Sequence, residues 1–391
     1  MAKDKFSLRI ALNELGGAQW TGGITYRNNL IKSLSLLNPD QKLFFVSKES
    51  KPDKDLSHLE LIKVNGSSSF LDRQIDRVTR RTMGKDHLLA KVLKGKNIDI
   101  LFPHSLNAGS GTKSIYWIPD FQFVHLPHLY TPAQLRQYNI KLKRYFADAD
   151  MIVVSSGDAY EDFKKFSPEF LDKVRIMRFV AHVPGDLYND DPAQVSSVYH
   201  LPPDFIYMPN QFWAHKNHML VLEALTILRE KGIRPFIVCS GNPVDVRDPL
   251  HLARFLLRLS EAGLRDQVAI LGLIPHNHVY WLIRQSKCVL NPSLFEGWST
   301  SVEESKSVGK RMILSDLNVH IEQDPPKSLY FKRDSAADLA EKLAQVWQEV
   351  PAGPDSELEA QAREALPERM KEFAATFLSV CEEAVNKPAR K

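Results

Sequence analysis

Two carboxylates in one short stretch have a spacing that suits a ligand site. Glu296 and Glu304 lie in residues 291–309, NPSLFEGWSTSVEESKSVG, after an apolar run at 288–290 that predicts a buried strand. A helical pattern begins at about Ser299. A strand, a glycine loop and a helix N-terminus favour an anionic ligand, because the first N–H groups of a helix lack intrahelical partners and the dipole is positive there. Glutamates can accept protons from sugar hydroxyls, so the stretch favours a polyol that carries phosphate.

The bulk properties describe a globular protein with room for two domains. The chain has 391 residues, of which 43% are hydrophobic and 25% charged. Its net charge of +4 is too mild to predict nucleic acid as a partner, but it fits an anionic substrate or membrane surface if the charge is clustered. The three cysteines, Cys239, Cys288 and Cys381, lack metal-ligand spacing, which favours reduced thiols and a cytoplasmic location. Neither a signal-peptide core nor a run of about 18 apolar residues occurs.

Strand-like and helix-like segments alternate along the chain, which predicts an α/β fold with parallel sheets. The predicted strands are residues 7–12, 43–46, 59–64, 98–102, 114–118, 151–155, 174–180, 205–208, 236–239, 268–271, 288–290, 312–314 and 329–331. The main predicted helices are residues 24–37, 132–147, 216–231 and 367–386. A stretch of low periodicity, residues 182–203, contains four prolines and indicates a linker. We therefore expect two Rossmann-like domains, with the site at the carboxyl ends of the strands.

The stretch around the two glutamates also resembles a known signature. Pro292-Ser293, Glu296-Gly297-Trp298 and Glu304 resemble the E-x7-E motif of retaining glycosyltransferases with a GT-B fold, the group 1 or family 4 class. The resemblance extends from Gly22-Gly23 to the terminal helix. It implies that Glu296 contacts the donor sugar, that Glu304 binds the ribose hydroxyls, and that the backbone of Gly297, Trp298, Ser299, Thr300 and Ser301 holds the diphosphate. A solvated acid at a helix start is the ordinary alternative for either glutamate alone.

The resemblance divides the chain into four parts. Residues 1–185 would form the acceptor-side Rossmann-like domain, 186–203 the linker and 204–366 the nucleotide-sugar domain, while residues 367–391 would form a helix that crosses back to the first domain. The two domains of a GT-B enzyme face each other across a cleft, so the donor would bind mainly to the second domain and the acceptor hydroxyl would enter from the first.

Further residues match motifs of the resembled class in the second domain. Lys216 matches a lysine that grips the donor diphosphate, but the arginine expected shortly before it falls on Asn210 or Gln211. His215 or an arginine from elsewhere in the chain could replace that cation. Gly272, Leu273 and Ile274 match a turn that holds the nucleobase through backbone groups, although a simple turn is an equal alternative for this turn and for Gly241.

In the first domain, Gly22 and Gly23 lie in a predicted loop, residues 13–23, where glycines let the backbone approach a ligand. A tight turn without a ligand is the alternative. Asp120 follows a predicted strand, and His125 follows it among apolar residues. Relatives carry a His-Asp pair where this chain has Pro119-Asp120, so His125 could supply the imidazole that orients the sugar or the acceptor hydroxyl. A loop histidine without such a role is the alternative.

Residues 70–96 mix cationic and apolar side chains. A solvated charged face is the ordinary interpretation, and an interfacial helix on anionic lipid or a surface for acceptor phosphates is the functional one.

The resemblance implies a hexosyltransferase without cofactor or metal, working on a glycan or lipid-linked acceptor in bacterial surface polysaccharide synthesis, in the cytoplasm or on the inner face of the membrane. The alternatives are a sugar phosphorylase of the same fold, an inactive scaffold at the membrane, and a nucleotide-sugar epimerase.

Overall fold

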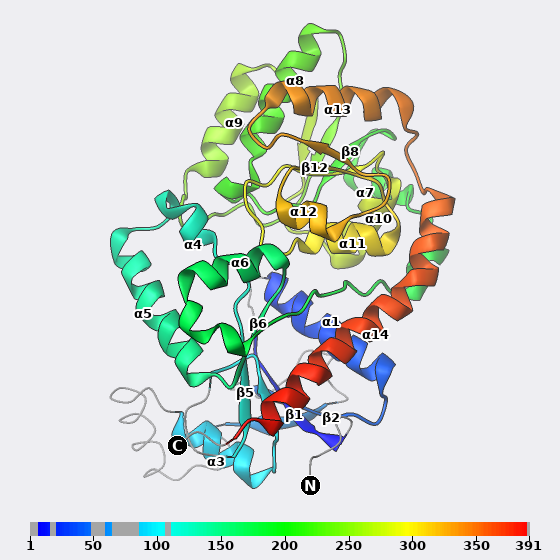
Figure 1. Cartoon of the computed structure of the whole chain (residues 1–391). Coiled ribbons are helices and arrows are strands. Elements are labelled where there is room, and N and C mark those ends of the chain that lie inside the picture. Colours follow the sequence, from blue (N-terminus) through cyan, green and yellow to red (C-terminus); the bar gives the residue numbers. More distant parts are fainter. Residues whose placement is uncertain (1–6, 16–20, 48–58, 65–85, 106–110, 389–391) are drawn as a thin grey trace. The chain divides into compact units, whose positions relative to one another are not determined.

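The structure, a computed structural model, describes residues 7–15, 21–47, 59–64, 86–105 and 111–388. The chain divides into two compact units (Figure 1). The first comprises residues 1–121, 131–179 and 368–391, and the second comprises residues 122–130 and 180–367. The long helix α14 (Ser356–Asn386) starts in the second unit and ends in the first.

The first unit contains a seven-stranded sheet in which every neighbouring pair of strands is parallel. Its order is β3-β2-β1-β4-β5-β6-β7. The strands are β1 (Arg9–Asn13), β2 (Lys42–Ser47), β3 (Glu60–Lys63), β4 (Ile100–Phe102), β5 (Lys113–Trp117), β6 (Met151–Val154) and β7 (Val174–Ile176). The helices on this unit are α1 (Thr21–Leu37), α3 (His87–Gly95), α5 (Pro132–Asp148), α6 (Gly157–Phe166) and η4 (Pro168–Lys173).

The two faces of this sheet have different cores. Alternate strand residues such as Ala11 and Leu101 pack with Leu89 and Leu93 of α3. On the other face, the ring of Tyr26 in α1 stacks on Trp117 at 4.1 Å and lies edge-on to Phe373 of α14. Aromatic pairs of this kind add to the hydrophobic stabilisation. The end of α14 is therefore part of the core of the first unit.

The second unit contains a six-stranded parallel sheet of order β10-β9-β8-β11-β12-β13. Its strands are β8 (Ile206–Met208), β9 (Ile237–Cys239), β10 (Val268–Ile270), β11 (Val289–Asn291), β12 (Met312–Ser315) and β13 (Leu329–Phe331). Its helices are α4 (Gln122–His125), η3 (Pro127–Leu129), η5 (Gly185–Asn189), α7 (Gln194–Tyr199), η6 (Ala214–Lys216), α8 (His218–Glu230), α9 (His251–Glu261), α10 (His276–Gln285), α11 (Thr300–Val308), α12 (Asn318–Gln323) and α13 (Ala336–Glu349). Two parallel sheets, one in each compact unit, confirm the predicted α/β class.

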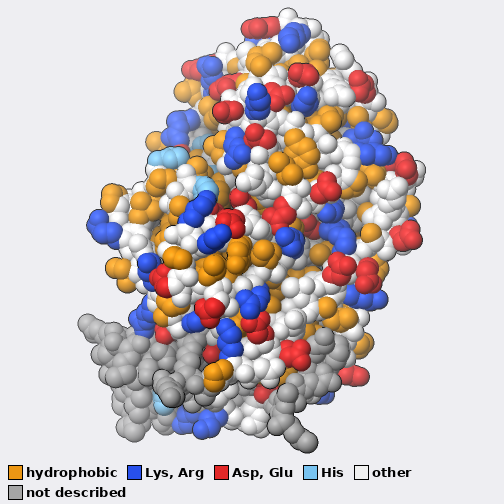
Figure 2. All heavy atoms as spheres, in the orientation of Figure 1, with side chains coloured by type: hydrophobic (Ala, Val, Ile, Leu, Met, Phe, Trp, Pro, Cys, Tyr) orange, Lys and Arg blue, Asp and Glu red, His pale blue; other side chains and the backbone are white. Residues whose placement is uncertain are grey.

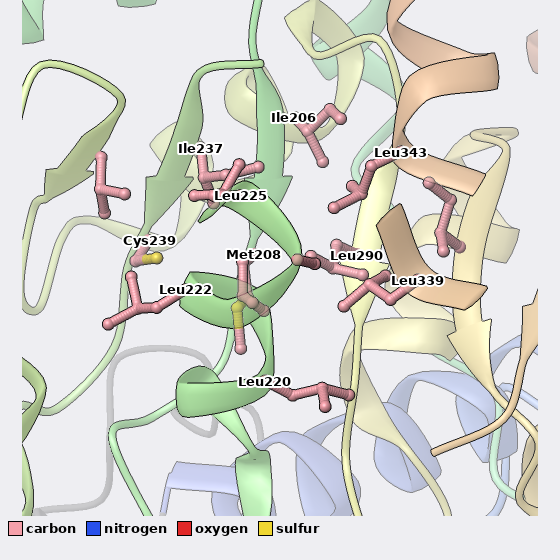
Figure 3. Packing of buried hydrophobic residues seen from close by; sticks show 14 of the residues in the cluster. Ile206, Met208, Leu220, Leu222, Leu225, Ile237, Cys239, Leu290, Leu339 and Leu343 are labelled. Carbon is pink, nitrogen blue, oxygen red and sulfur yellow. The ribbon is translucent and has the colours of Figure 1, made fainter. Parts of the chain in front are cut away.

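The core of the second unit lies between one face of its sheet and helices α8, α9 and α13. Figure 3 shows Met208 and Leu290 of the strands pointing toward Leu222 of α8 and Leu339 of α13. The burial of such side chains contributes about 25 cal/mol for each Å² of apolar surface removed from water. This packing holds the strand ends, from which the loops of the candidate site begin. All three cysteines are free and buried.

Two helix starts were predicted wrongly. Helix α1 begins at Thr21, so Gly22 and Gly23 lie in its first turn and not in the preceding loop. The N–H groups of a first turn need no intrahelical partner, which makes helix-breaking residues less costly there. The proline-rich stretch contains η5 and α7. Helix α14 begins 11 residues before the predicted Pro367 and contains this proline in its interior.

Acidic and basic side chains are interspersed on the face of the molecule in Figure 2, in keeping with the small net charge. Within the described residues, none of the helices has the length and apolar character needed to cross a bilayer.

A buried histidine makes the second unit sensitive to acid. Burial, with a smaller contribution from His251, lowers the pKa of His218 to about 3. The unfolded chain, with a pKa of about 6.5, therefore binds the proton first as the pH falls. The stabilising effect is present in full above pH 6.5 and is lost as the pH falls toward 3.

We expect this histidine to lower the free energy of unfolding by about 2 kcal/mol between pH 7 and pH 5. Urea unfolding at several pH values measures the effect. In His218→Phe the new ring can still stack on Phe212, as the imidazole does at a ring separation of 4.2 Å. In this variant the fall in the free energy of unfolding between pH 7 and pH 5 should be smaller by about 2 kcal/mol. An unchanged dependence would contradict the assignment.

Candidate active site

The strand order of the second unit places a ligand site between β8 and β11. These strands are neighbours although three α-helices and two strands separate them in the chain, and the order reverses at this point. In open parallel sheets, ligands bind at the carboxyl ends of the strands beside such a switch point. The loop after β8 carries Asn210, Gln211 and Lys216, and the loop after β11 carries Glu296. The sheet therefore brings two predicted groups of donor-binding residues to one edge.

An ion pair joins these two loops. Lys216 Nζ lies 2.5 Å from Glu296 Oε1, and the two side chains are 14% and 9% exposed. Burial alone would raise the pKa of Glu296, but the charge and the hydrogen bond of Lys216 outweigh it and hold the pKa below its ordinary value. The carboxylate is therefore ionised at neutral pH and can accept hydrogen bonds. The backbone supports the pair, since Leu294 N–H donates to the His215 carbonyl at 2.8 Å.

Asn291, the last residue of β11, organises the loop from the side of the strand. Its amide nitrogen donates to Ser299 Oγ at 2.8 Å and to Ser301 Oγ at 3.1 Å. Its amide oxygen lies 2.7 Å from Ser293 Oγ, which is also 2.7 Å from Glu296 Oε1. Asn291 is fully buried, so these bonds are formed away from water, where losing them is costly. They hold Glu296 and the start of α11 in a single arrangement.

The predicted phosphate-binding turn leads into α11, which begins at Thr300. Within this turn the Ser299 N–H already donates to Gln323 Oε1 at 3.2 Å, and Gln323 Nε2 donates back to the Ser299 carbonyl at 3.0 Å. Gly297 and Trp298 precede this position and are partly exposed. Gln323 of α12 thus supports the start of α11. A bound phosphate would have to accept hydrogen bonds from backbone N–H groups other than that of Ser299.

Glu304 lies one turn into α11 and has a partner from another loop. Its Oε1 is 2.8 Å from His276 Nε2, and Glu304 is 6% exposed while the imidazole is 57% exposed. His276 starts α10, directly after the turn with Gly272, Leu273 and Ile274. The predicted ribose ligand and the predicted nucleobase turn are therefore neighbours.

The turn predicted to bind the nucleobase is partly exposed and has glycine at a left-handed position. Gly272 has a φ of +67°, a conformation that glycine adopts without strain. Leu273 is 62% exposed. The Gly272 carbonyl accepts a hydrogen bond from the Gly241 N–H at 2.8 Å, which joins the turns after β9 and β10.

The loop after β8 is closely packed at the position of the expected arginine. Asn210 is 2% exposed, and its amide oxygen has no hydrogen-bond partner. A Cβ on Gly241 would lie 2.8 Å from Gln211 Cα, so only glycine fits beside this loop. His215 is buried, and burial, with the charges of Lys216 and Arg247 adding to it, holds the pKa of His215 well below its ordinary value. A neutral His215 does not replace the expected cation.

The helix predicted to begin at Lys216 begins two residues later. Lys216 ends the short helix η6, and α8 begins only at His218. Asn217 between them has a φ of +59° and makes no side-chain cap. Its Nδ2 donates instead to the Arg333 carbonyl at 3.1 Å. Asn217 therefore precedes α8 without capping it through its side chain.

The candidate residues of the first domain are divided between the two units. Asp120 lies three residues after β5, in the first unit, as do Gly22 and Gly23 in α1. His125 ends α4, which belongs to the second unit, and its ring lies 5.0 Å from that of Phe295. His125 is thus beside the residue that precedes Glu296.

Sequence reasoning missed three residues at this site: His276, Asn291 and Arg247. Each follows a predicted strand or turn. Because ligands of open parallel sheets bind at the carboxyl ends of the strands, this position was the signal that could have identified them. Arg247 lies in the loop after β9 and contacts His215 Nδ1 at 3.4 Å.

Comparison with known proteins agrees with the fold. Residues 195–365 match the family model described as "Glycosyl transferases group 1". No curated protein matches the chain. Among solved structures, a glycosyltransferase from Rickettsia africae ESF-5 is 17% identical, with a TM-score of 0.67 and coverage of 98% of this chain and 100% of that one. Anabaena HepE in complex with UDP and glucose is 13% identical, with a TM-score of 0.67 and coverage of 95% and 99%. WaaG, a glycosyltransferase involved in lipopolysaccharide biosynthesis, is 15% identical, with a TM-score of 0.56 and coverage of 96% and 98%.

At these identities the solved structures establish the fold alone, which is the GT-B fold. The group 1 domain in residues 195–365 adds the functional class. Together they support a GT-B glycosyltransferase, as the sequence predicted.

Proposed function

We propose that the protein is a retaining glycosyltransferase that moves a sugar from a nucleotide diphosphate sugar to a hydroxyl of a glycan or lipid-linked acceptor. The observation that carries the proposal is the Lys216–Glu296 pair, 2.5 Å apart at the switch point and beside the start of α11. The group 1 domain and the HepE complexes with UDP and UDP-glucose support a nucleotide sugar as donor. The role of WaaG in lipopolysaccharide biosynthesis supports surface polysaccharide synthesis as the pathway.

In the proposed reaction the bond between the anomeric carbon and the diphosphate breaks while the acceptor oxygen attacks the same face of the sugar. The acceptor proton passes to a donor phosphate oxygen. Negative charge grows on the leaving diphosphate, and Lys216 and the N-terminus of α11 stabilise it. Preorganised charges of this kind typically contribute 10²- to 10³-fold to the rate. Glu296 would bind the donor sugar, Asp120 and His125 would orient the acceptor or sugar, and no metal ion would be needed.

Incubation with UDP-, GDP-, dTDP- and ADP-sugars, with and without EDTA, tests the proposal. We expect hydrolysis or transfer with one nucleotide, unaffected by EDTA, and NMR of the product should show the anomeric configuration of the donor. Turnover that requires inorganic phosphate would identify a phosphorylase. Donor conversion to a free epimer would identify an epimerase, and the absence of binding by every donor would favour a scaffold.

We also propose that residues 70–96 associate with an anionic membrane. Only the end of this stretch, residues 86–96, can be compared with the structure. Residues 65–85 lie outside the described residues. In α3 the apolar residues Leu88, Leu89 and Leu93 are buried in the core of the first unit, so they are not available to lipid. Co-sedimentation with anionic and neutral vesicles tests membrane binding.

The contact between Glu304 and the turn after β10 yields a prediction for nucleotide binding. Glu304→Ala should weaken the binding of the nucleotide by roughly 1–3 kcal/mol, because charge-assisted hydrogen bonds to the ribose are lost. Isothermal titration calorimetry with UDP and GDP measures the effect. Glu230→Ala, on the exposed end of α8, is the matched control and should bind normally. Equal affinities in the Glu304 variant and the wild type would remove Glu304 from the donor site.

A further inference from the structure

Arg247 has an unusual set of partners for a residue outside the predicted site. It lies in the loop between β9 and α9, and its side chain is 19% exposed. Asp245, which is 2% exposed, accepts hydrogen bonds from Arg247 Nε at 3.3 Å and from the Arg247 N–H at 3.0 Å. The same carboxylate accepts from the Ala214 N–H at 3.1 Å. A buried aspartate therefore fixes the guanidinium beside the loop that carries Lys216.

The other side of the guanidinium contacts residues 122–130. Arg247 Nη1 donates to Gln122 Oε1 and to the Tyr130 hydroxyl, the latter at 3.3 Å. The guanidinium carbon lies 5.7 Å from the centre of the Tyr130 ring and 5.6 Å from that of Trp213. Cation–π contacts of this kind are attractive and are stronger when partly shielded from water. Gln122 and Tyr130 are the two ends of the segment, so a single side chain holds both.

The centre of this segment lies against the loop of Glu296. His125 contacts Phe295 with a ring separation of 5.0 Å. Tyr130 OH also donates to Gln122 Oε1 at 3.0 Å, which closes the segment on itself. Arg247 thus contacts both ends of the segment that carries His125 and, at His215, the residue that precedes Lys216.

We propose that Arg247 is a positioning residue that holds residues 122–130, and with them His125, beside the loop of Glu296. The inference rests on the proposed transferase activity for its kinetic consequence. Arginine suits this role because its planar fork of N–H groups meets several acceptors in a fixed geometry, whereas a lysine ammonium cannot. In the competing role, Arg247 binds the donor phosphates directly and replaces the arginine expected at Asn210 or Gln211. That role predicts a loss of affinity for UDP.

The test combines a structural readout with a kinetic one. In Arg247→Ala, amide hydrogen exchange of peptides covering residues 122–130 should become faster than in the wild type, whether or not the protein is an active transferase. In the same variant kcat should fall by roughly 10- to 100-fold, since a displacement of about 1 Å at a reacting group can cost that much. The Kd for UDP should stay within about twofold. Arg234→Ala, at an exposed arginine paired with Asp266, is the control and should change none of the three.

Two further variants keep the test decisive. Arg247→Lys retains the charge without the planar fork and should not restore kcat. Tyr130→Phe retains the ring and removes one acceptor, and its effect on kcat should be non-additive with that of Arg247→Ala. Unchanged exchange of residues 122–130 overturns the positioning role. A large loss of UDP affinity in Arg247→Ala, with unchanged exchange, assigns the residue to the donor phosphates instead. A wild type that turns over no donor refutes the proposed function and leaves the exchange result to decide the structural claim.

Discussion

Replacement of Lys216 by alanine should lower kcat by 10²- to 10³-fold. The ammonium lies at the switch point beside the N-terminus of α11, where charge would grow on the leaving diphosphate, and removing one such preorganised group costs about 2.7–4 kcal/mol of transition-state stabilisation. Steady-state kinetics with the identified donor measures the loss. Lys231→Ala, at an exposed lysine after α8, is the matched control and should be fully active.

The ion pair with Glu296 adds a structural effect that must be separated from the catalytic one. Lys216→Ala leaves a mostly buried carboxylate without its cation, which raises the pKa of Glu296 and lowers stability. The double variant Lys216→Met, Glu296→Gln removes both charges and should recover most of the stability while staying inactive. An active Lys216→Ala enzyme, or full recovery of activity in the double variant, would remove the lysine from the mechanism.

Replacement of Gly309 by alanine should destabilise the second unit by roughly 2–5 kcal/mol. Gly309 ends α11 with a φ of +90°, a conformation that costs an L-residue about 1–2 kcal/mol. A Cβ there would lie 2.3 Å from the Leu358 carbonyl oxygen in the first turn of α14. Because the obstacle is backbone and not a flexible side chain, helix and chain must move apart, and overpacking of this kind typically costs a further 1–3 kcal/mol. Urea unfolding measures the change.

Gly353 provides the control for this prediction. Its φ of +102° is similar, but an added Cβ would meet nothing within 4 Å. Gly353→Ala should therefore show the conformational cost alone, and the difference between the two variants measures the contact of α11 with α14. Equal losses of stability in both variants would show that the close approach of Gly309 to the Leu358 backbone does not affect the free energy of unfolding.

Much of the fold was predictable because the signals are local. Short apolar runs predicted strands such as β6 and β12, and the parallel α/β class followed from the alternation of strands with helices. The start of α1 and the start of α14 were predicted wrongly for the same reason. Gly22, Gly23 and Pro367 are locally unfavourable to helices, but tertiary packing overrides such preferences. For α14, the residues before the proline are packed: Leu358 and Leu366 are buried, and Glu359 pairs with Arg284 at 2.8 Å.

The site was predictable only as separate pieces. The loops after β8 and β11 could be recognised by their residue types. Residue types and periodicity do not show which loops meet, because Lys216 and Glu296 are 80 positions apart in the chain.

Residue patterns were enough to predict two parallel α/β units, with Glu296 in a loop after a strand, Lys216 at the start of a helix and Glu304 about one turn into another. The tertiary structure decided how they are paired. The strand order, with β8 next to β11, brings Lys216 to Glu296, and the neighbouring turn brings His276 to Glu304. It also placed Arg247 against Gln122, Tyr130 and His215. The physical reason is that periodicity reports only which side of an element is buried, whereas the separation of two side chains depends on how whole elements pack around a common core.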